Sequence, residues 1–261
     1  MFRQKNVLIT GASSGIGSAL AERFAQAGAQ LVLVARRKDR LTALTKELKV
    51  HGVAVHNIVA DLVEPGACDR IVSEAKRAVG RIDVLVNNAG VGEYGRFHEQ
   101  DVDVLENMMQ LNMSALVRLT HRVLPDMIER RSGHLLNIAS TAAFQPTPYM
   151  CVYGATKSFV LNFSLSLWEE LRRRGIGVTC VCPGPVKTEF FDRGGFETQK
   201  SHMTRLAMSA DQIAESAYTK LSQGRTAHVP GMLNKLGTIL VRFAPLRTVT
   251  RISSKLLAPK S

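Results

Sequence analysis

A serine, a tyrosine and a lysine near the middle of the chain have the types and spacing that proton transfer requires. Residues 135–157 are predicted to run from a buried strand through Ser140 and a proline-containing loop into a helix that bears Tyr153 and Lys157. Side chains four residues apart share one face of a helix, and a nearby ammonium lowers the pKa of a phenol. Tyr153 would then act as acid and base on an oxygen that Ser140 orients. Taken alone, this spacing is more often an ordinary helix surface, so the prediction depends on the segments upstream.

Strands and helices are predicted to alternate along those segments. Short apolar runs predict buried strands at residues 5–10, 30–35, 54–59, 82–86 and 135–139. Helical patterns lie between them, at residues 38–50, 65–79 and 102–128. Such alternation is typical of a parallel, doubly wound sheet, which binds ligands at the carboxyl ends of its strands. Because no linker rich in Ser, Gly or Pro divides the 261 residues, we expect a single Rossmann-like α/β domain.

A glycine-rich turn, TGASSGIG at residues 10–17, follows the first predicted strand and precedes a helical pattern. Glycine lets the backbone approach a ligand closely, and a helix amino terminus offers unpaired N–H groups to phosphate oxygens. The spacing of Gly11, Gly15 and Gly17 is GxxxGxG and differs from the common GxGxxG dinucleotide pattern. In the context of a strand and a helix, we interpret the turn as a phosphate-binding site; a plain structural loop is the alternative.

The second predicted strand ends in Arg36 and Arg37. Dinucleotide-binding units that take NAD often place an acidic residue here, which binds the ribose 2′-hydroxyl. An arginine instead suits a 2′-phosphate, because its planar fork matches phosphate oxygens. We therefore favour NADP(H) over NAD(H), against the alternative that both arginines only begin a solvated helix.

Composition limits the remaining possibilities. The four cysteines, Cys68, Cys151, Cys180 and Cys182, have neither disulfide-framework nor zinc-ligand spacing, so we expect no metal site. The first residues contain too short an apolar run for a signal peptide, and no segment approaches ~18 uninterrupted apolar residues. We therefore expect a cytoplasmic protein that does not span a membrane.

The net charge of +12 is concentrated in the last part of the chain. No Asp or Glu follows Glu215, whereas eight Lys or Arg residues do. After residues 1–231, which we assign to the catalytic domain, residues 232–261 are predicted to form a basic, amphipathic helical extension that includes a helix after Pro245. Such a helix suits the surface of an anionic membrane, or it packs on its own subunit or a neighbour and closes the pocket. Nucleic acid is not expected, because no recognition motif accompanies the charge.

Taken together, the chain resembles the short-chain dehydrogenase/reductase family, in its compact single-domain branch. The resemblance spans residues 5–188 and rests on residues in the family's order and spacing: the turn at residues 10–17, Asp61, Asn87, Asn88, Ala89, Gly90, Asn112, Ser140, Tyr153, Lys157, Pro183 and Gly184. The family fold would be the doubly wound sheet already expected. Its activity would be hydride transfer between a nicotinamide and a carbonyl or alcohol.

The resemblance implies roles for these residues. Tyr153 would be the acid and base, Lys157 would lower its pKa and hold the nicotinamide ribose, Ser140 would orient the substrate oxygen, and Asn112 would anchor a water in the proton relay. From its apolar neighbours alone, Asn112 could equally make an ordinary hydrogen bond between helices. The expected coenzyme-binding residues are Gly11, Ser13, Ser14, Gly15, Ile16, Gly17, Arg36, Arg37, Asp61, Leu62, Asn88, Ala89, Gly90, Tyr153, Lys157, Pro183, Gly184, Val186 and Thr188.

Residues 141–152 and 189–207 are expected to shape the substrate pocket. Their aromatic content predicts an apolar or lipid-like carbonyl substrate, with contacts from Ser140, Phe144, Tyr149, Tyr153 and Phe190. A 3-oxoacyl thioester reductase is a variant of this hypothesis, and a non-catalytic NADP(H)-binding scaffold or redox sensor is the alternative from another class. The family's helices often pair between subunits, and an apolar stripe at Phe159, Phe163, Leu167 and Leu171 leads us to expect a homodimer or homotetramer.

Overall fold

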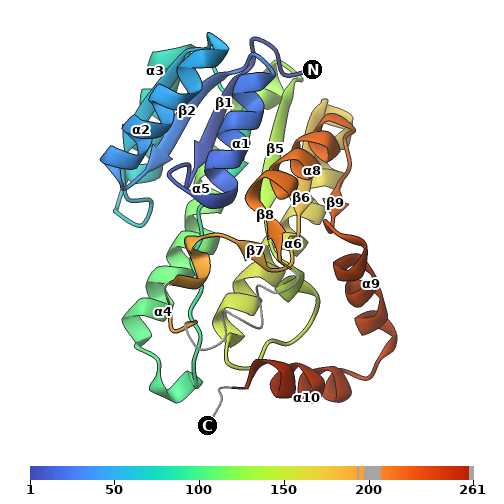
Figure 1. Cartoon of the computed structure of the whole chain (residues 1–261). Coiled ribbons are helices and arrows are strands. Elements are labelled where there is room, and N and C mark those ends of the chain that lie inside the picture. The colour runs from blue at the N-terminus through green and yellow to red at the C-terminus, as the bar shows by residue number, and fades with distance from the viewer. Residues whose placement is uncertain (193, 197–206, 259–261) are drawn as a thin grey trace.

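The chain folds around a seven-stranded parallel sheet (Figure 1). The structure is a computed structural model that describes residues 1–192, 194–196 and 207–258. Each of the five predicted strands is present, with ends that differ from the prediction by at most two residues. The sheet order is β3-β2-β1-β4-β5-β6-β9. The bounds are Asn6–Thr10 (β1), Gln30–Ala35 (β2), Val55–Val59 (β3), Val84–Asn87 (β4), Gly133–Ile138 (β5), Ile176–Val181 (β6) and Ala227–His228 (β9), with β7 (Val186–Lys187) and β8 (Met208–Ser209) forming a separate parallel pair.

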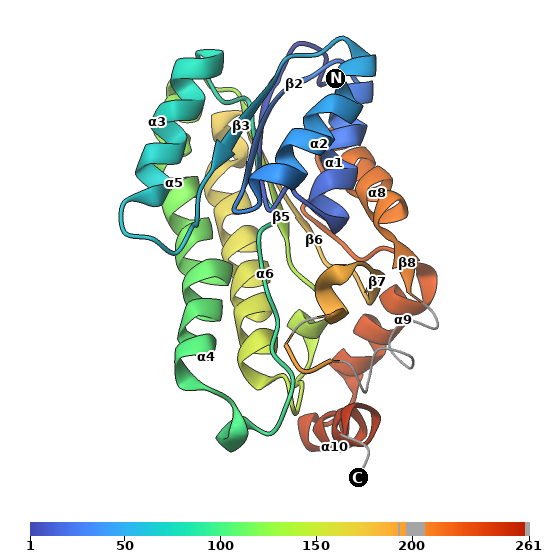
Figure 2. The same cartoon turned by 60° about the vertical axis from the view of Figure 1, so that its left-hand side comes forward.

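Helices cover both faces of the sheet (Figure 2). Because successive side chains of a strand point to opposite faces, Val7 and Ile9 belong to one buried core and Leu8 to the other. The first core packs against α1 (Gly15–Gln26), α2 (Lys38–Leu48) and α8 (Ala210–Ser222). The second core packs against α3 (Ala67–Val79), α5 (Leu116–Glu129) and α6 (Cys151–Leu171). The single Rossmann-like α/β domain predicted from the sequence is therefore confirmed.

Strand β1 pairs with β2 on one side and with β4 on the other. The chain order therefore reverses at β1, and the crevice beyond the carboxyl ends of β1 and β4 is where such sheets bind ligands. Short 3₁₀ segments border this edge at Thr141–Phe144 (η4) and Glu189–Asp192 (η6). Others lie at Lys49–His51, Phe97–Glu99 and Arg172–Arg174.

The helix predicted over residues 102–128 consists of three parts. A regular helix, α4 (Val102–Met109), continues into a π-helical segment, Gln110–Ala115, which continues into α5. π-helical segments interrupt helices most often at functional sites. The segment contains Asn112, and the contacts of this side chain account for the π-helical turn.

The last part of the chain forms two helices joined by a short 3₁₀ segment, η7 (Val241–Phe243). These helices are α9 (Met232–Leu240) and α10 (Leu246–Leu257), and α10 begins directly after Pro245 as the sequence predicts. Figures 1 and 2 show α10 beyond the carboxyl edge of the sheet, at the end of the molecule where α4 and α6 also end or begin. No helix within the described residues is long and apolar enough to cross a membrane.

Candidate active site

A cavity of about 400 Å³ follows the carboxyl edge of the sheet from the end of β2 to α6. The structure gathers around it all but four of the residues that the sequence singles out. The predicted residues that line the cavity are Gly11, Ser13, Ser14, Gly15, Ile16, Arg36, Arg37, Asp61, Leu62, Asn88, Ala89, Gly90, Ser140, Tyr153, Lys157, Pro183, Gly184, Val186, Thr188 and Phe190. Gly17, Asn112, Phe144 and Tyr149 are not among the lining residues.

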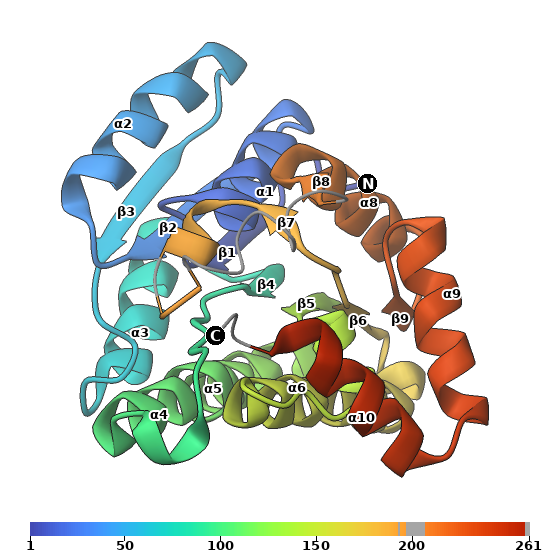
Figure 3. The same cartoon turned by 60° about the horizontal axis from the view of Figure 1, so that its bottom comes forward.

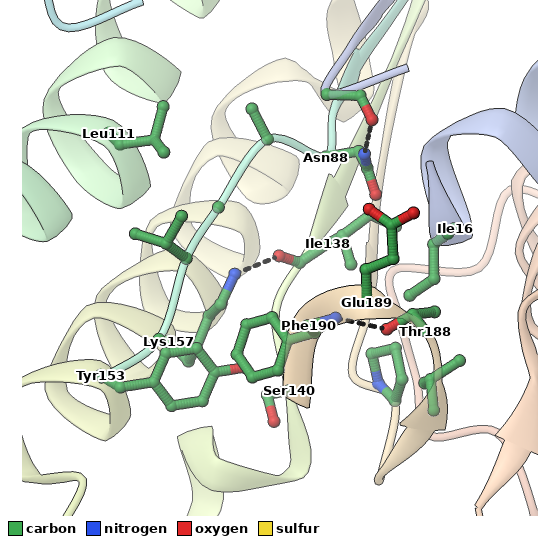
Figure 4. A pocket seen from close by; sticks show the side chains of 18 of the residues that line it. Ile16, Asn88, Leu111, Ile138, Ser140, Tyr153, Lys157, Thr188, Glu189 and Phe190 are labelled. Atoms are coloured by element: carbon green, nitrogen blue, oxygen red, sulfur yellow. Dashed lines mark hydrogen bonds between the residues drawn. The ribbon is translucent and has the colours of Figure 1, made fainter. Parts of the chain in front are cut away.

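Tyr153 and Lys157 lie on one face of α6 and point into the cavity (Figure 4). Both side chains are buried, with exposed fractions of 8% and 5%. The Lys157 ammonium donates a hydrogen bond to the Ile138 carbonyl oxygen at 3.0 Å, which ties α6 to the end of β5. Lys157 Nζ lies 5.7 Å from the centroid of the Tyr153 ring. The tie to β5 fixes the lysine close to the phenol and leaves its remaining N–H groups for other partners.

Burial dominates the acidity of both side chains. Desolvation raises the pKa of Tyr153 to about 12, and a hydrogen bond with Ser140 opposes the rise. Desolvation also lowers the pKa of Lys157 to about 8. The sequence predicts that Lys157 lowers the pKa of Tyr153, whereas in the protein without coenzyme the burial of the phenol dominates and its pKa is raised. At neutral pH Tyr153 is therefore a proton donor, beside an ammonium whose charge is only weakly screened.

Ser140 lies at the carboxyl end of β5 and serves as the cap of η4. Its hydroxyl accepts a hydrogen bond from the Ala142 backbone N–H at 3.1 Å, which fixes the side chain at the edge of the cavity. Figure 4 shows the Ser140 hydroxyl on the same side of the cavity as the Tyr153 ring. One substrate oxygen placed between the two hydroxyls would accept a hydrogen bond from each.

Asn112 holds the site together from behind the cavity. Its side chain accepts a hydrogen bond from Val91 N–H at 3.0 Å and donates one to the Val91 carbonyl at 2.9 Å. A second donation, at 3.0 Å, reaches the hydroxyl of Thr156 on α6. Asn112 thus links the π-helical segment, the segment after β4 and the helix of Tyr153. The hydrogen bond between helices that the sequence offered as an alternative for Asn112 is present, to Thr156. The π-helical segment places the Asn112 amide within reach of both Val91 and Thr156.

The glycine turn has the shape of an anion site. Gly11 and Gly15 adopt left-handed φ angles of +64° and +59°, which favour glycine. A Cβ on Gly17 would collide with the Gly11 carbonyl oxygen, so the first turn of α1 sits directly against the loop. Ser14, the residue that precedes α1, makes no capping hydrogen bond with its side chain. The first N–H groups of α1 are therefore left for an anionic group at the cavity.

The two arginines after β2 have different surroundings. Arg37 donates hydrogen bonds to the hydroxyls of Ser14, at 2.8 Å, and Ser13, at 3.2 Å, and forms an ion pair with Glu189 at 2.8 Å. Arg36 is more exposed, and its one ion pair within the described residues is a long one with Asp61, at 3.4 Å. Both line the cavity beside the glycine turn. The contact between Arg37 and Glu189 was not anticipated, since the two residues are far apart in sequence and no local pattern joins them.

Aromatic side chains close the other end of the cavity. The Phe190 ring packs on the Tyr153 ring, with centroids 5.5 Å apart. Phe144 and Tyr149, expected to contact substrate, do not line the cavity. Phe144 packs on a buried cluster behind η4, and Tyr149, in a left-handed conformation (φ +65°), packs against Tyr94 with centroids 6.3 Å apart. Residues 197–206, which the sequence assigns to the same pocket, lie outside the described residues.

The model of the short chain dehydrogenase family matches residues 5–195. The chain belongs to this family. It is therefore an oxidoreductase that acts on CH–OH or C=O groups, and the expectation drawn from the motifs is confirmed.

Relatives of this short-chain dehydrogenase extend over nearly its whole length. It is similar to sulfoacetaldehyde reductase 2 of Chromohalobacter salexigens, with 39% identity over 87% of this chain and 90% of the relative. It is 35% identical to an NADP-dependent 3-hydroxy acid dehydrogenase of Shigella flexneri, over 81% of this chain and 87% of the relative. Among solved structures, a short-chain dehydrogenase from Sphingobium yanoikuyae in complex with NADPH shares 37% identity, with a TM-score of 0.81 over 92% of this chain and 96% of that one.

The cavity of this short-chain dehydrogenase fits a nicotinamide dinucleotide. Uncapped N–H groups at the glycine turn and two arginines suit the phosphates, and the half-buried Ser140 and the buried Tyr153 lie at the far end. The lining residues that were not predicted individually include Glu189 and Leu257. Glu189 begins the segment 189–207 that was expected to shape the pocket, and Leu257 lies on the tail helix, for which closure of the pocket was one of the alternatives.

Proposed function

We propose that the protein is an NADP(H)-dependent reductase of apolar ketones or aldehydes. The observation that carries this proposal is that Arg36 and Arg37 stand at one end of the cavity and Ser140, Tyr153 and Lys157 at the other. The arginines suit a ribose 2′-phosphate, and within the described lining residues the only carboxylates near them are Asp61 and Glu189, each paired with an arginine. The similar structure from Sphingobium yanoikuyae is a complex with NADPH, and the Shigella relative is named as NADP-dependent, which supports the same coenzyme here.

When bound, NADPH supplies the hydride; the chain supplies the proton and the geometry. Tyr153 donates its hydroxyl proton to the substrate oxygen as negative charge develops there, and its raised pKa keeps that proton in place at neutral pH. Ser140 holds the same oxygen with a second hydrogen bond. Lys157 stabilises the phenolate that remains, because its ammonium lies close by in a site of low polarity. In this proposal Asn112 acts by positioning α6 through Thr156.

Apolar side chains at the Tyr153 end support an apolar substrate. Phe190, Met150 and Leu257 line this end of the cavity. Among the described lining residues the only cation near Tyr153 is Lys157, which is engaged with Ile138. The relatives are named for sulfoacetaldehyde and for 3-hydroxy acids, both of which carry an anionic group. A site for such substrates would need a further cation, so we place the natural substrate of this enzyme in a different, apolar class.

Two other hypotheses make different predictions. A 3-oxoacyl thioester reductase would share the chemistry and accept a carrier-bound chain. A non-catalytic NADP(H) scaffold would bind coenzyme without turnover, but the presence of the full set of Asn112, Ser140, Tyr153 and Lys157 at one site argues against loss of chemistry.

The test is oxidation of NADPH and of NADH by the purified full-length protein, followed by the absorbance of the reduced nicotinamide with ketones, aldehydes and 3-oxoacyl thioesters of increasing chain length. We expect turnover with NADPH that increases with the length of an apolar ketone and is much weaker with NADH. Preference for thioesters would select the acyl reductase. Coenzyme binding without turnover on any compound would favour the scaffold.

We also propose that the enzyme is a cytoplasmic homodimer or homotetramer. The predicted stripe on α6 divides in the structure: Leu171 is buried and Leu167 packs on the core, whereas Phe159 is 39% exposed and stacks on Phe163 with centroids 5.9 Å apart. An exposed Phe159 that stacks on the partly buried Phe163 supports subunit contacts on this helix. The measurement is the mass in solution by light scattering, with Phe159→Ser expected to lower it.

A further inference from the structure

The surface formed by α9, η7 and α10, called here the tail surface, is far more apolar than the rest of the molecule's exterior. Of the large apolar side chains that are exposed within the described residues, half belong to this short part of the chain. Phe243 is 84% exposed and Met232 88%. The others are Leu233, Leu236, Ile239, Leu240, Leu246, Ile252 and Leu256. Exposed apolar surface gathered in this way marks an interaction site.

Helix α10 rests on the protein through its less apolar side. Val249 and Ser253 are buried, at 6% and 4% exposure, and Leu257 lines the cavity. Ile252 and Leu256, which the sequence pattern places on one apolar stripe with Val249, are exposed instead. The sequence left open whether the helix uses its apolar stripe to pack on its own subunit. Within one subunit it does not. The helix contacts the protein through Val249, Ser253 and Leu257, and the larger apolar side chains of Ile252 and Leu256 stay exposed.

The charge of the tail surface is of one sign. Lys235, Arg242, Arg247, Arg251 and Lys255 all lie on these helices and their connection, and the sequence has no carboxylate side chain after Glu215. A two-fold contact between two tail surfaces would bring cations against cations, because such an interface uses the same patch on both subunits. The tail surface therefore suits a partner that takes up apolar side chains and carries negative charge.

The tail surface adjoins the cavity. The end of α10 is held there by a hydrogen bond from the Tyr94 hydroxyl to the Leu257 carbonyl oxygen. Figure 3, seen from the end that carries the tail, shows α10 crossing α6 with its last residues directed to the space in front of β4 and β5. A partner bound to the outer side of α10 would therefore lie next to the part of the cavity wall that Leu257 forms.

We propose that the tail surface docks the enzyme on an anionic lipid bilayer, with the mouth of the cavity next to the lipid. Cations attract the headgroups while Phe243, Ile252 and the other exposed apolar side chains enter the boundary with the acyl chains. A bilayer does not need a groove of complementary shape. It can therefore take up side chains from both α9 and α10, which η7 joins. The inference is independent of the chemistry at Tyr153, and either can fail alone.

The first experiment is sedimentation of the full-length protein with two kinds of vesicle, pure phosphatidylcholine and phosphatidylcholine with roughly 30% phosphatidylglycerol. We expect binding to the anionic vesicles, much weaker binding to the neutral ones, and release as salt increases. Absence of binding to anionic vesicles at low salt overturns the proposal. So does equal binding to both kinds, because the cations would then have no role.

Matched variants test whether the tail surface makes the contact. Phe243→Ser is compared with Val50→Ser, whose side chain is 82% exposed next to α2. Arg251→Glu is compared with Arg77→Glu on α3, also exposed. At about 1 kcal/mol per charge near the headgroups, reversal of Arg251 corresponds to roughly 30-fold weaker partition, and loss of the Phe243 ring to about tenfold. The controls are expected to bind like the unaltered protein, and losses of equal size in the controls overturn the assignment.

Two further readouts separate the possible partners. Turnover of a short soluble ketone without vesicles is expected to be the same for all four variants, which shows that they are folded. If Phe243→Ser instead lowers the mass of the protein in solution, the tail surface is a contact between subunits and the proposal is wrong. If Arg251→Glu impairs only reaction with a carrier-bound thioester while vesicle binding persists, the partner is an acidic protein, which also contradicts it.

Discussion

The two ends of the cavity are built by different forces. At the coenzyme end, hydrogen bonds fix the backbone: the Asn88 side chain donates to the carbonyls of Thr10, at 2.9 Å, and Gly11, at 3.2 Å. At the substrate end, apolar packing dominates, with Phe190 against Tyr153 and Leu257 brought in from the last helix. Hydrogen-bonded loops have one geometry, whereas packed aromatic side chains can be exchanged at little cost to the fold. The coenzyme end is therefore suited to one fixed ligand, and the substrate end to ligands that differ in shape.

Tyr153 lies at the substrate end and is also expected to contact the coenzyme, so its removal gives the largest predicted effect. In Tyr153→Phe the ring still packs on Phe190 and only the proton donor is lost. We expect turnover to fall by roughly 10³-fold or more, as for loss of general acid catalysis, while the NADPH dissociation constant changes little. Stopped-flow turnover and fluorescence titration of NADPH measure the two quantities. Parallel losses in both would mean that Tyr153 is a structural part of the coenzyme end.

The pH dependence follows from the burial of the same residue. Because burial raises the pKa of Tyr153 to about 12, the phenol is protonated at neutral pH, as reduction requires. Alcohol oxidation needs the phenolate, whose fraction increases about tenfold per pH unit below that pKa. Between about pH 6 and 8 we expect kcat/KM for oxidation to rise about 100-fold and kcat/KM for reduction to stay flat. At higher pH the rise should weaken, since Lys157, with a pKa of about 8, loses its charge.

That pH profile is measured in both directions with the same alcohol and ketone pair. Tyr153→Phe provides the control, because its residual activity should lack the rise in the direction of oxidation. A flat oxidation profile in the unaltered enzyme would show that another group takes the proton.

At the coenzyme end, the two arginines are expected to differ. Arg36 is exposed and, within the described residues, forms an ion pair only with Asp61. Arg36→Ala should therefore weaken NADPH binding by ~10-fold or more, the value of a charged hydrogen bond, and leave NADH binding almost unchanged. Arg37 also holds the hydroxyls of Ser13 and Ser14. Arg37→Ala should therefore weaken the binding of both coenzymes, with the larger loss of affinity for NADPH. Calorimetric titration of each variant with each coenzyme distinguishes these patterns, and equal losses of NADPH and NADH in Arg36→Ala would contradict a 2′-phosphate role.

The coenzyme end was predicted from sequence more fully than the substrate end, for a physical reason. Gly11 and Gly15 need positive φ, and the phosphate site needs a strand, a turn and a helix that are consecutive in the chain. Such requirements leave a local pattern. The substrate end depends on contacts between distant segments, such as Tyr94 with Leu257, and on the direction of single rings. Phe144 was assigned to the pocket by its position, but its ring packs on the buried cluster behind η4, a choice that no short pattern encodes.

The ion pairs of Glu189 connect the two ends and provide the smallest predicted effect. Its carboxylate lies 2.8 Å from Arg37 and 3.1 Å from Arg40, and the next residue is Phe190, whose ring covers Tyr153. A 2′-phosphate bound to Arg37 would meet this carboxylate as a neighbour of like charge. Glu189→Gln should therefore tighten NADPH binding by about three- to fivefold, the scale of a partly exposed ion pair, with NADH unaffected.

The matched control is Glu215→Gln, which removes a carboxylate of another partly exposed ion pair, with Arg23 of α1. It should leave both dissociation constants unchanged. If Glu189→Gln also alters KM for an apolar ketone, then the ion pairs of Glu189 set the position of Phe190. Contacts at the coenzyme end would then influence substrate binding at the other end. If it weakens NADPH instead, Glu189 supports Arg37 in the geometry that the phosphate needs, and the carboxylate is part of the coenzyme site.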